Sequence, residues 1–112
     1  MKRITTIYEY RYDFNRKTIR CTEYECIETD KLYRTADKRS FNTTYTTQIG
    51  KDAVPIVEET YGGVGVISAE PLTNEQIKTL MVAPYRKTIE HCENRIMGLK
   101  QKISAIKEAW SE

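Results

Sequence analysis

A chain of 112 residues is long enough for one small domain, and short enough that a partner subunit would add useful buried surface. Hydrophobic residues make up 39% and charged residues 30% of the chain, which is ordinary for a globular protein and too apolar for general disorder. The formal net charge of +2 gives no strong electrostatic case for duplex nucleic acid or an anionic membrane. The sequence has no apolar run of about 18 to 20 residues and no apolar signal-peptide core at the N-terminus, so we expect a cytosolic protein.

The first half of the chain alternates with the period of two that places successive side chains on opposite faces of a sheet. In the first predicted strand, the even-numbered residues from Ile4 to Phe14 form the apolar face. The residues expected to face water are Thr5, Glu9, Arg11 and Asp13. The second predicted strand, 18–29, shifts its apolar positions between odd and even numbers, which predicts a bulge or a twist near Glu23.

Two more strands are predicted over 32–35 and 41–49, and the short connections indicate an antiparallel meander. Between residues 50 and 69 the signal is weaker, because Pro55 disfavours a central strand while Gly62 and Gly63 offer a hairpin turn. We expect one or two strands there, which gives a sheet of five to six strands over 1–69.

The helical part of the chain is predicted to begin at Thr73, which has the spacing of a capping box with Gln76. Pro84 cannot continue a helical hydrogen-bond ladder but suits the first turn of a new helix. The sequence therefore predicts a short helix over 73–83 and a long helix over 84–111. The predicted fold is α+β, in a single domain of residues 1–112.

The long helix carries the sharpest pattern in the chain. Apolar residues follow Tyr85 at alternating spacings of four and three, a heptad repeat that predicts a narrow seam facing another helix. The alternative is a helix lying across its own sheet, although such helices usually show a broader apolar stripe. Because the other predicted helix is short, we expect the partner to be a second copy and the protein to be a homo-oligomer. The predicted interface consists of Ile89, Cys92, Ile96, Leu99, Ile103, Ile106 and Trp110.

Few residues in the sequence could support catalysis or metal binding. The single histidine, His91, is adjacent to Cys92, and neighbours on a helix point apart, so we expect a solvated histidine. Three cysteines without a C-x-x-C pair fit free thiols better than a disulfide framework or a zinc centre. We therefore predict a protein that is not an enzyme, with no catalytic residue, metal or cofactor.

Two groups of residues are candidates for binding a ligand. Eight tyrosines, most of them in the sheet half, are interspersed with arginines, and rings with guanidinium groups can stack bases and hold phosphates. The second group lies at the start of the predicted long helix. The alternative for the sheet is that tyrosine is simply a good strand residue, and the alternative for the helix is that its start is an ordinary polar surface. The predicted ligand-binding residues are Arg20, Tyr24 and Arg34 in the sheet and Tyr85, Arg86, Asn94 and Arg95 in the helix.

This layout of Tyr- and Thr-rich strands, a break at Pro84 and a terminal heptad helix resembles the small accessory proteins of bacteriophages. The overall plan is similar to the Thoeris anti-defence family, oligomeric sponges that bind cyclic ADP-ribose-type immune signals. The resemblance is one of layout and composition, so it carries over no site residue. It implies that the protein sequesters a cyclic nucleotide in the host cytosol. The ligand would be held where the sheet of one subunit meets the helix of a neighbouring subunit.

Two other classes of protein fit the same features. One is a protein inhibitor of a bacterial defence nuclease, of the anti-CRISPR type, whose partner would be a host defence protein. At +2 the chain does not resemble a nucleic-acid mimic, but an inhibitor that simply docks needs no such charge. The other is a phage structural or assembly protein.

Overall fold

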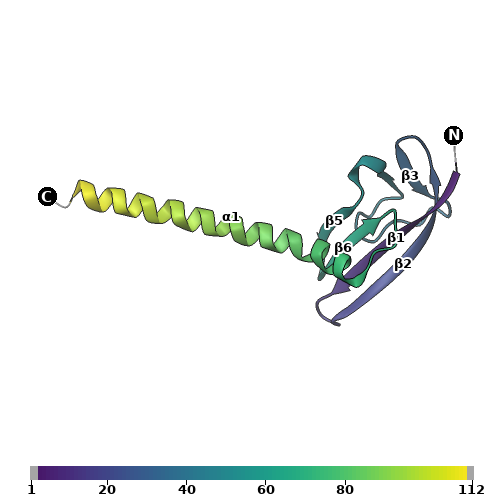
Figure 1. Ribbon diagram of the computed structural model, residues 1–112, viewed down its shortest axis with the longest axis horizontal. Coiled ribbons are helices and arrows are strands. Elements are labelled where there is room, and N and C mark those ends of the chain that lie inside the picture. The colour runs from purple at the N-terminus through teal and green to yellow at the C-terminus, as the bar shows by residue number, and fades with distance from the viewer. Residues whose placement is uncertain (1–2, 111–112) are drawn as a thin grey trace. The chain divides into compact units, whose positions relative to one another are not determined.

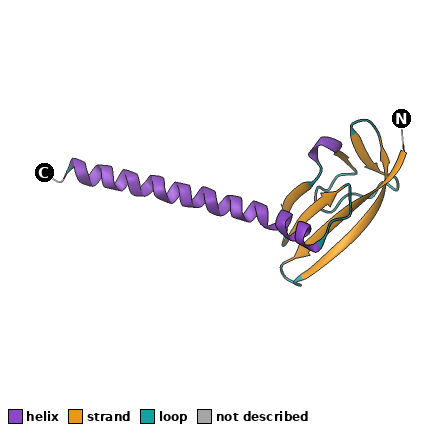
Figure 2. Cartoon of the chain, viewed as in Figure 1, coloured by secondary structure: helices purple, strands orange, loops and turns teal. Residues whose placement is uncertain are grey.

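The computed structural model describes residues 3–110, which form six strands and one long α-helix (Figures 1 and 2). The predicted sheet and helix also included residues 1, 2 and 111, and the predicted domain residue 112, all outside the described residues. The α+β fold and the predicted strand number are confirmed. The elements are β1 (Arg3–Asp13), β2 (Thr18–Glu28), β3 (Leu32–Thr35), β4 (Gln48–Gly50), a 3₁₀ turn η1 (Lys51–Ala53), β5 (Ile56–Thr60), β6 (Gly63–Ser68) and α1 (Asn74–Ala109).

The six strands form one antiparallel sheet in the order β4-β3-β2-β1-β6-β5. The first four strands are the predicted meander, and the β5–β6 hairpin adds to the free edge of β1. Strands β4 and β5 lie at opposite edges, yet only residues 51–55, including the η1 turn, connect them. A flat sheet of six strands would separate its edges by about 24 Å. The sheet therefore curls.

The predicted strand over 41–49 is wrong for most of its length. Residues 42–44 form a turn, Tyr45 has a positive φ of 58°, and only Gln48–Gly50 pairs as β4. The cause is a buried carboxylate. Glu9, which the sequence placed in water, is 1% exposed and accepts the backbone N–H of Thr43 at 2.7 Å and that of Asn42 at 3.2 Å. It also accepts the Tyr24 hydroxyl at 2.7 Å.

The predicted faces of β1 and the predicted bulge in β2 are also wrong. Strands β1 and β2 pair without interruption from Arg3 opposite Glu28 to Asp13 opposite Thr18, so β2 has no bulge near Glu23. The odd-numbered residues of β1 form the face with the main core, whereas Ile4 is 66% exposed. The buried residues of β2 are the even-numbered Tyr24, Cys26 and Glu28, whereas the odd-numbered Ile19 is 60% exposed and Cys21 is exposed.

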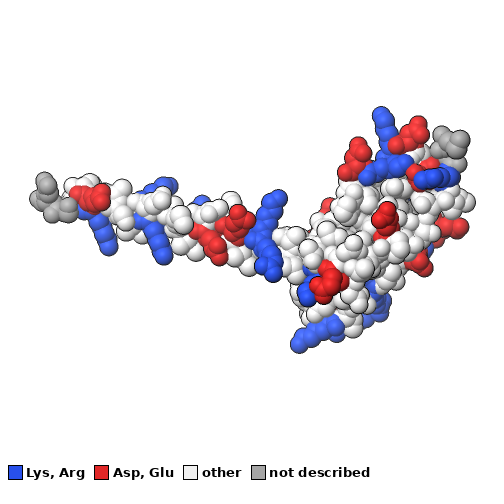
Figure 3. All heavy atoms as spheres, in the orientation of Figure 1, with Lys and Arg blue, Asp and Glu red and all other residues white. Residues whose placement is uncertain are grey.

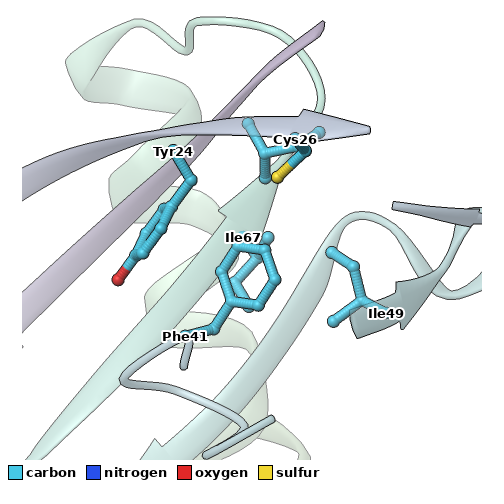
Figure 4. Packing of buried hydrophobic residues seen from close by; sticks show 6 residues of the cluster. Tyr24, Cys26, Phe41, Ile49 and Ile67 are labelled. Carbon is cyan, nitrogen blue, oxygen red and sulfur yellow. The ribbon is translucent and has the colours of Figure 1, made fainter. Parts of the chain in front are cut away.

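The main core lies on the odd-numbered face of β1, and Figure 4 shows its side chains pointing toward one another from β2, β4, β6 and the 41–47 loop. Its members are Ile7, Tyr24, Cys26, Phe41, Ile49 and Ile67. On the opposite face, Tyr10, Val64 and Val66 are buried. There the Tyr10 hydroxyl accepts the backbone N–H of Leu72 at 2.9 Å, which holds the segment that leads into α1.

Helix α1 begins as the sequence predicts, but it does not break. The Thr73 hydroxyl accepts the Gln76 N–H at 3.2 Å and the Gln76 side chain accepts the Thr73 N–H at 2.9 Å, which confirms the capping box. The predicted boundary at Pro84 is wrong, because Pro84 lies inside one helix of 36 residues. Proline removes a single N–H donor, and the many other hydrogen bonds of so long a helix are retained. The chain divides into two compact parts after Met81.

Candidate functional site

The first candidate surface is the predicted seam, defined as Ile89, Cys92, Ile96, Leu99, Ile103, Ile106 and Trp110. All seven side chains are exposed, and the isoleucines, Leu99 and Trp110 range from 46% to 80% exposed. The predicted seam residue at the start of the helix, Tyr85, is half-buried. Contiguous exposed apolar side chains on a helix mark an interaction surface.

The seam is flanked mainly by basic side chains, and Figure 3 shows charges of both signs along α1. In a heptad repeat, the positions next to the two core positions flank the seam. When isoleucine is placed at the first core position, the acidic residue at these flanking positions is Glu93. The flanking cations are Arg95, Lys100, Lys102 and Lys107. This surplus of positive charge bears on which partner and which orientation the seam accepts.

The second candidate site is a hollow of about 250 Å³ at one end of the sheet, which we call the arginine hollow. It is lined by Arg11, Tyr12, Asp13, Arg16, Thr18, Arg20, Tyr61, Gly62 and Gly63. These residues come from the β1–β2 hairpin and the β5–β6 turn. The two hairpin ends are held together by the Phe14 N–H, which donates to the Gly62 carbonyl at 2.9 Å.

Local sequence explains both hairpin ends of the arginine hollow. The Asp13 carboxylate accepts the backbone N–H groups of Asn15 at 2.8 Å and Arg16 at 3.1 Å, which closes the β1–β2 turn. Gly62 has a φ of +78°, a conformation that side chains disfavour and that glycine adopts at no steric cost. The hydrogen bond from Arg16 is the main reason that the pKa of Asp13 is lowered, and the charges of Arg16 and Arg11 add to it.

The electrostatics of the arginine hollow are dominated by cations. Arg11 and Arg20 are directly opposite each other in the β1–β2 register, so both lie on the same face of the sheet. Among residues 3–110, neither of them nor Arg16 forms an ion pair with an acidic side chain. The hollow therefore has three guanidinium groups and one carboxylate.

The structure separates the three ligand residues that the sequence predicted in the sheet. Arg20 lines the arginine hollow, whereas Arg34 lines a different hollow of about 440 Å³ with Lys38. Tyr24 is in the core, where burial and the hydrogen bond to Glu9 raise its pKa, and the Arg39 guanidinium lies 4.7 Å from its ring centre. The four predicted helix residues, Tyr85, Arg86, Asn94 and Arg95, all belong to the part of the chain after Met81.

The list of ligand residues predicted from the sequence omits Arg11, Arg16 and Tyr61, which line the arginine hollow with Arg20. The signal was present in part, since both hairpin turns were predicted, and hairpin ends are places where side chains from distant segments meet. What the sequence lacked was the pairing of β6 with β1, which sets the β5–β6 turn beside the β1–β2 hairpin.

Other chemistry is sparse in the described part of the chain. Residues 3–110 contain no group of three or more His, Cys, Asp or Glu side chains arranged to hold a metal ion. His91 and Cys92 are both exposed on α1. Burial raises the pKa of the Cys26 thiol to about 11. Within the same residues, no helix combines the length and apolarity that crossing a membrane requires.

Comparison of the chain with known protein families, curated proteins and solved structures finds no match.

Proposed function

We propose that the protein is a non-enzymatic binding protein that assembles through its seam and sequesters a small anionic molecule of the nucleotide class. The observation that carries the proposal is the exposed seam, whose seven residues follow heptad spacing over three heptads. A solvated helix gains nothing from such a pattern, whereas paired helices bury it.

The free energies of burial and association favour pairing of two α1 helices. If each seam side chain contributes about 1 kcal/mol when its exposed part is buried, two helices gain on the order of 14 kcal/mol. Association costs about 4 to 15 kcal/mol in lost translational and rotational freedom. The gain exceeds the cost over all but the upper end of that range, and the occupant to which we assign the seam is a second copy of this chain.

The charges beside the seam favour an antiparallel pair. In a parallel pair, Arg95 of one helix meets Lys100 of the other, and Lys102 meets Lys107, so the contacts repel. In an antiparallel pair that sets Ile96 opposite Ile106, Glu93 meets Lys107 on both sides. Like charges then meet only where Lys100 and Lys102 face their own copies.

The nucleotide assignment is supported by the resemblance to the Thoeris anti-defence family, which rests on the strands and the terminal heptad helix, since the helix has no break at Pro84. In that setting, the protein would act in the cytosol of a phage-infected host and hold a cyclic ADP-ribose-type signal away from its receptor. Sequestration requires only affinity and abundance, which a small self-assembling chain can supply. The tyrosines and arginines of the sheet supply groups that bind such ligands.

The main alternative function is a protein inhibitor that docks on a host defence protein. The observation in its favour is the basic flank of the seam, which would complement a partner groove or helix edged by acidic side chains. A phage structural or assembly protein would use the seam in the same way as the proposed homo-oligomer, without a ligand.

The assembly is tested by sedimentation of a variant with aspartates in the seam and a control variant with an aspartate outside it. Replacing both Ile96 and Ile103 by Asp puts charges into the seam and should leave only monomers. Met97→Asp is the control, because Met97 is 60% exposed on the same helix but outside the seam. A wild-type chain that sediments as a monomer at high micromolar concentration would refute the assembly.

The ligand is tested by native mass spectrometry of protein purified from cells with active defence systems. A mass excess of several hundred daltons that is released on heating would support sequestration of a nucleotide. An oligomer that carries no added mass, and that retains a host protein in a pull-down, would favour the inhibitor instead.

A further inference from the structure

We propose that the arginine hollow is the phosphate-binding site of this protein, with Arg11, Arg16 and Arg20 contacting a phosphate ester and Tyr61 stacking on the attached base. The inference deepens the proposed function and rests on it for the nucleotide class of the ligand. The hollow itself is built wholly within the sheet part of the chain, between two hairpin ends.

The first argument is the cross-strand arginine pair. Like charges directly opposite each other on adjacent strands destabilise a sheet. Arg11 and Arg20 are such a pair, and no acidic side chain among the described residues forms an ion pair with either. An anion between the two guanidinium groups would turn this repulsion into two charge-assisted contacts.

The second argument is an unused donor. The Nε of Arg11 is buried and has no hydrogen-bond partner in residues 3–110. Buried donors nearly always have a partner, so an orphaned one calls for a missing acceptor. Arginine is the residue that most often binds phosphate oxygens through paired N–H groups.

The net charge and the volume of the arginine hollow also suit a phosphate group. Three arginines and Asp13 leave the hollow with a net charge of about +2, which matches a phosphate monoester of charge about −1.5 to −2 or the two linked phosphates of a cyclic ADP-ribose-type signal, about −2 in total. The volume of about 250 Å³ lies just below the range of pockets that enclose drug-sized ligands, about 300 to 1,000 Å³. The hollow therefore suits a phosphate with part of a nucleoside and leaves the base outside.

Tyr61 supplies a surface for that base. It stands in the β5–β6 turn, lines the hollow and is 99% exposed, the highest value among the large hydrophobic side chains. A fully solvated tyrosine ring at the rim of a cationic hollow can stack on any base, at a gain that does not depend on sequence.

The experiment is isothermal titration calorimetry of the full chain with AMP, adenosine and inorganic pyrophosphate. AMP should bind, pyrophosphate should bind more weakly than AMP, and adenosine should bind at least about tenfold more weakly, because the arginines recognise the phosphate. Arg20→Gln should weaken AMP binding at least about tenfold. Tyr61→Ala should weaken AMP binding but leave pyrophosphate binding unchanged.

The matched control is Lys38→Gln, which removes one positive charge, as Arg20→Gln does, from another exposed cation that lines a different hollow. It should leave AMP binding within about twofold of the wild type. A urea titration confirms folding, and Arg20→Gln should not lower the midpoint, since it relieves the repulsion with Arg11.

Four outcomes would overturn the site: no AMP binding at millimolar concentration, adenosine binding as tightly as AMP, Lys38→Gln weakening AMP binding as much as Arg20→Gln, or a co-purified nucleotide that Arg20→Gln does not release. The proposed function can fail separately. A chain that binds AMP in the hollow but stays monomeric and carries no cellular ligand refutes the sequestering assembly alone.

Discussion

Glu9 is the residue on which the interior of the sheet depends. Its carboxylate accepts hydrogen bonds from the Tyr24 hydroxyl and from the backbone N–H groups of Asn42 and Thr43, and it is 1% exposed. These contacts join β1, β2 and the 41–47 loop. A buried acceptor with three donors stabilises far more than an exposed one, because none of the donors can turn to water instead.

Replacing Glu9 by Gln should lower the free energy of unfolding by about 1 to 3 kcal/mol. The amide nitrogen would face backbone N–H groups that need an acceptor, so at least one buried donor would lose its partner. Urea denaturation measures the change, and Glu25→Gln, on the exposed side of β2, serves as the control. Equal midpoints for Glu9→Gln and the wild type would show that the loop is not held by this carboxylate.

Among the elements, β6 shows how closely the 41–47 loop packs on the sheet. A Cβ atom added at Gly65 would collide with the Oγ1, Cβ and Cγ2 atoms of Thr43. The loop can cross the sheet here only because β6 has no side chain at this position. The glycine in the middle of a strand, which would otherwise weaken it, is explained by this close approach.

Gly65→Ala should therefore destabilise the protein by about 1 to 3 kcal/mol, the usual cost of overpacking a well-packed interior. Gly50→Ala is the matched control, because a Cβ at Gly50 meets nothing within 4 Å and its φ of −75° suits alanine. Thermal unfolding of both variants should show a lower midpoint for Gly65→Ala alone. Similar midpoints would mean that the loop moves away from β6 at little expense.

Helix α1 contains a residue that reports the orientation of the proposed pair. Cys92 is exposed in the seam and, in a parallel pair, would face Cys92 of the second copy at disulfide distance. In the antiparallel pair it faces Trp110. Mild oxidation of a Cys21→Ser variant, which removes the other exposed thiol, should therefore give little Cys92-linked dimer.

The positive arm of that test uses two chains that both carry Cys21→Ser and Cys92→Ser. One also carries Ile96→Cys and the other Ile106→Cys. Mixed and oxidised, they should link to each other far more than to themselves, which mass spectrometry resolves. Predominant links between identical positions would establish a parallel pair and contradict the charge argument.

At the scale of the whole molecule, Glu28 connects segments from the start and the middle of the chain. Its carboxylate accepts the Arg3 Nε at 2.9 Å and the Lys51 Nζ at 2.6 Å, which ties β2 to β1 and to η1. The connection between the two edges of the curled sheet is therefore held partly by charge. The hydrogen bond from Arg3, followed by that from Lys51, lowers the pKa of Glu28 below its ordinary value.

A lowered pKa means that the unfolded chain binds a proton more readily than the folded one. The stabilisation from Glu28 is thus complete above the ordinary glutamate pKa of about 4.3 and is lost as the pH falls through its lower folded value. Urea midpoints should fall between pH 6 and pH 3, and Glu28→Gln should remove part of that dependence. A pH profile unchanged in Glu28→Gln would show that the two ion pairs contribute nothing.

Local patterns were sufficient for several features of this protein. The capping box at Thr73, the β1–β2 hairpin and the heptad spacing of α1 each depend on residues within a few positions of one another, so the sequence predicts them directly. The α+β class and the number of strands follow from the same short-range alternation. Pro84 misled the prediction because its local preference for a first turn is outweighed by a helix already formed on both sides.

The remaining features depend on residues far apart in the chain. The sequence predicts that Glu9 faces solvent, but in the structure Tyr24 and the 41–47 loop donate hydrogen bonds to its carboxylate. The sequence also predicts a strand over Phe41 to Thr47, but the hydrogen bonds to that carboxylate turn the backbone. The arginine hollow exists because β6 pairs with β1 and carries the β5–β6 turn to Arg11, Arg16 and Arg20. Alternation tells which side chains share a face, but long-range hydrogen bonds and burial determine which face becomes the core and which residues meet at its edge.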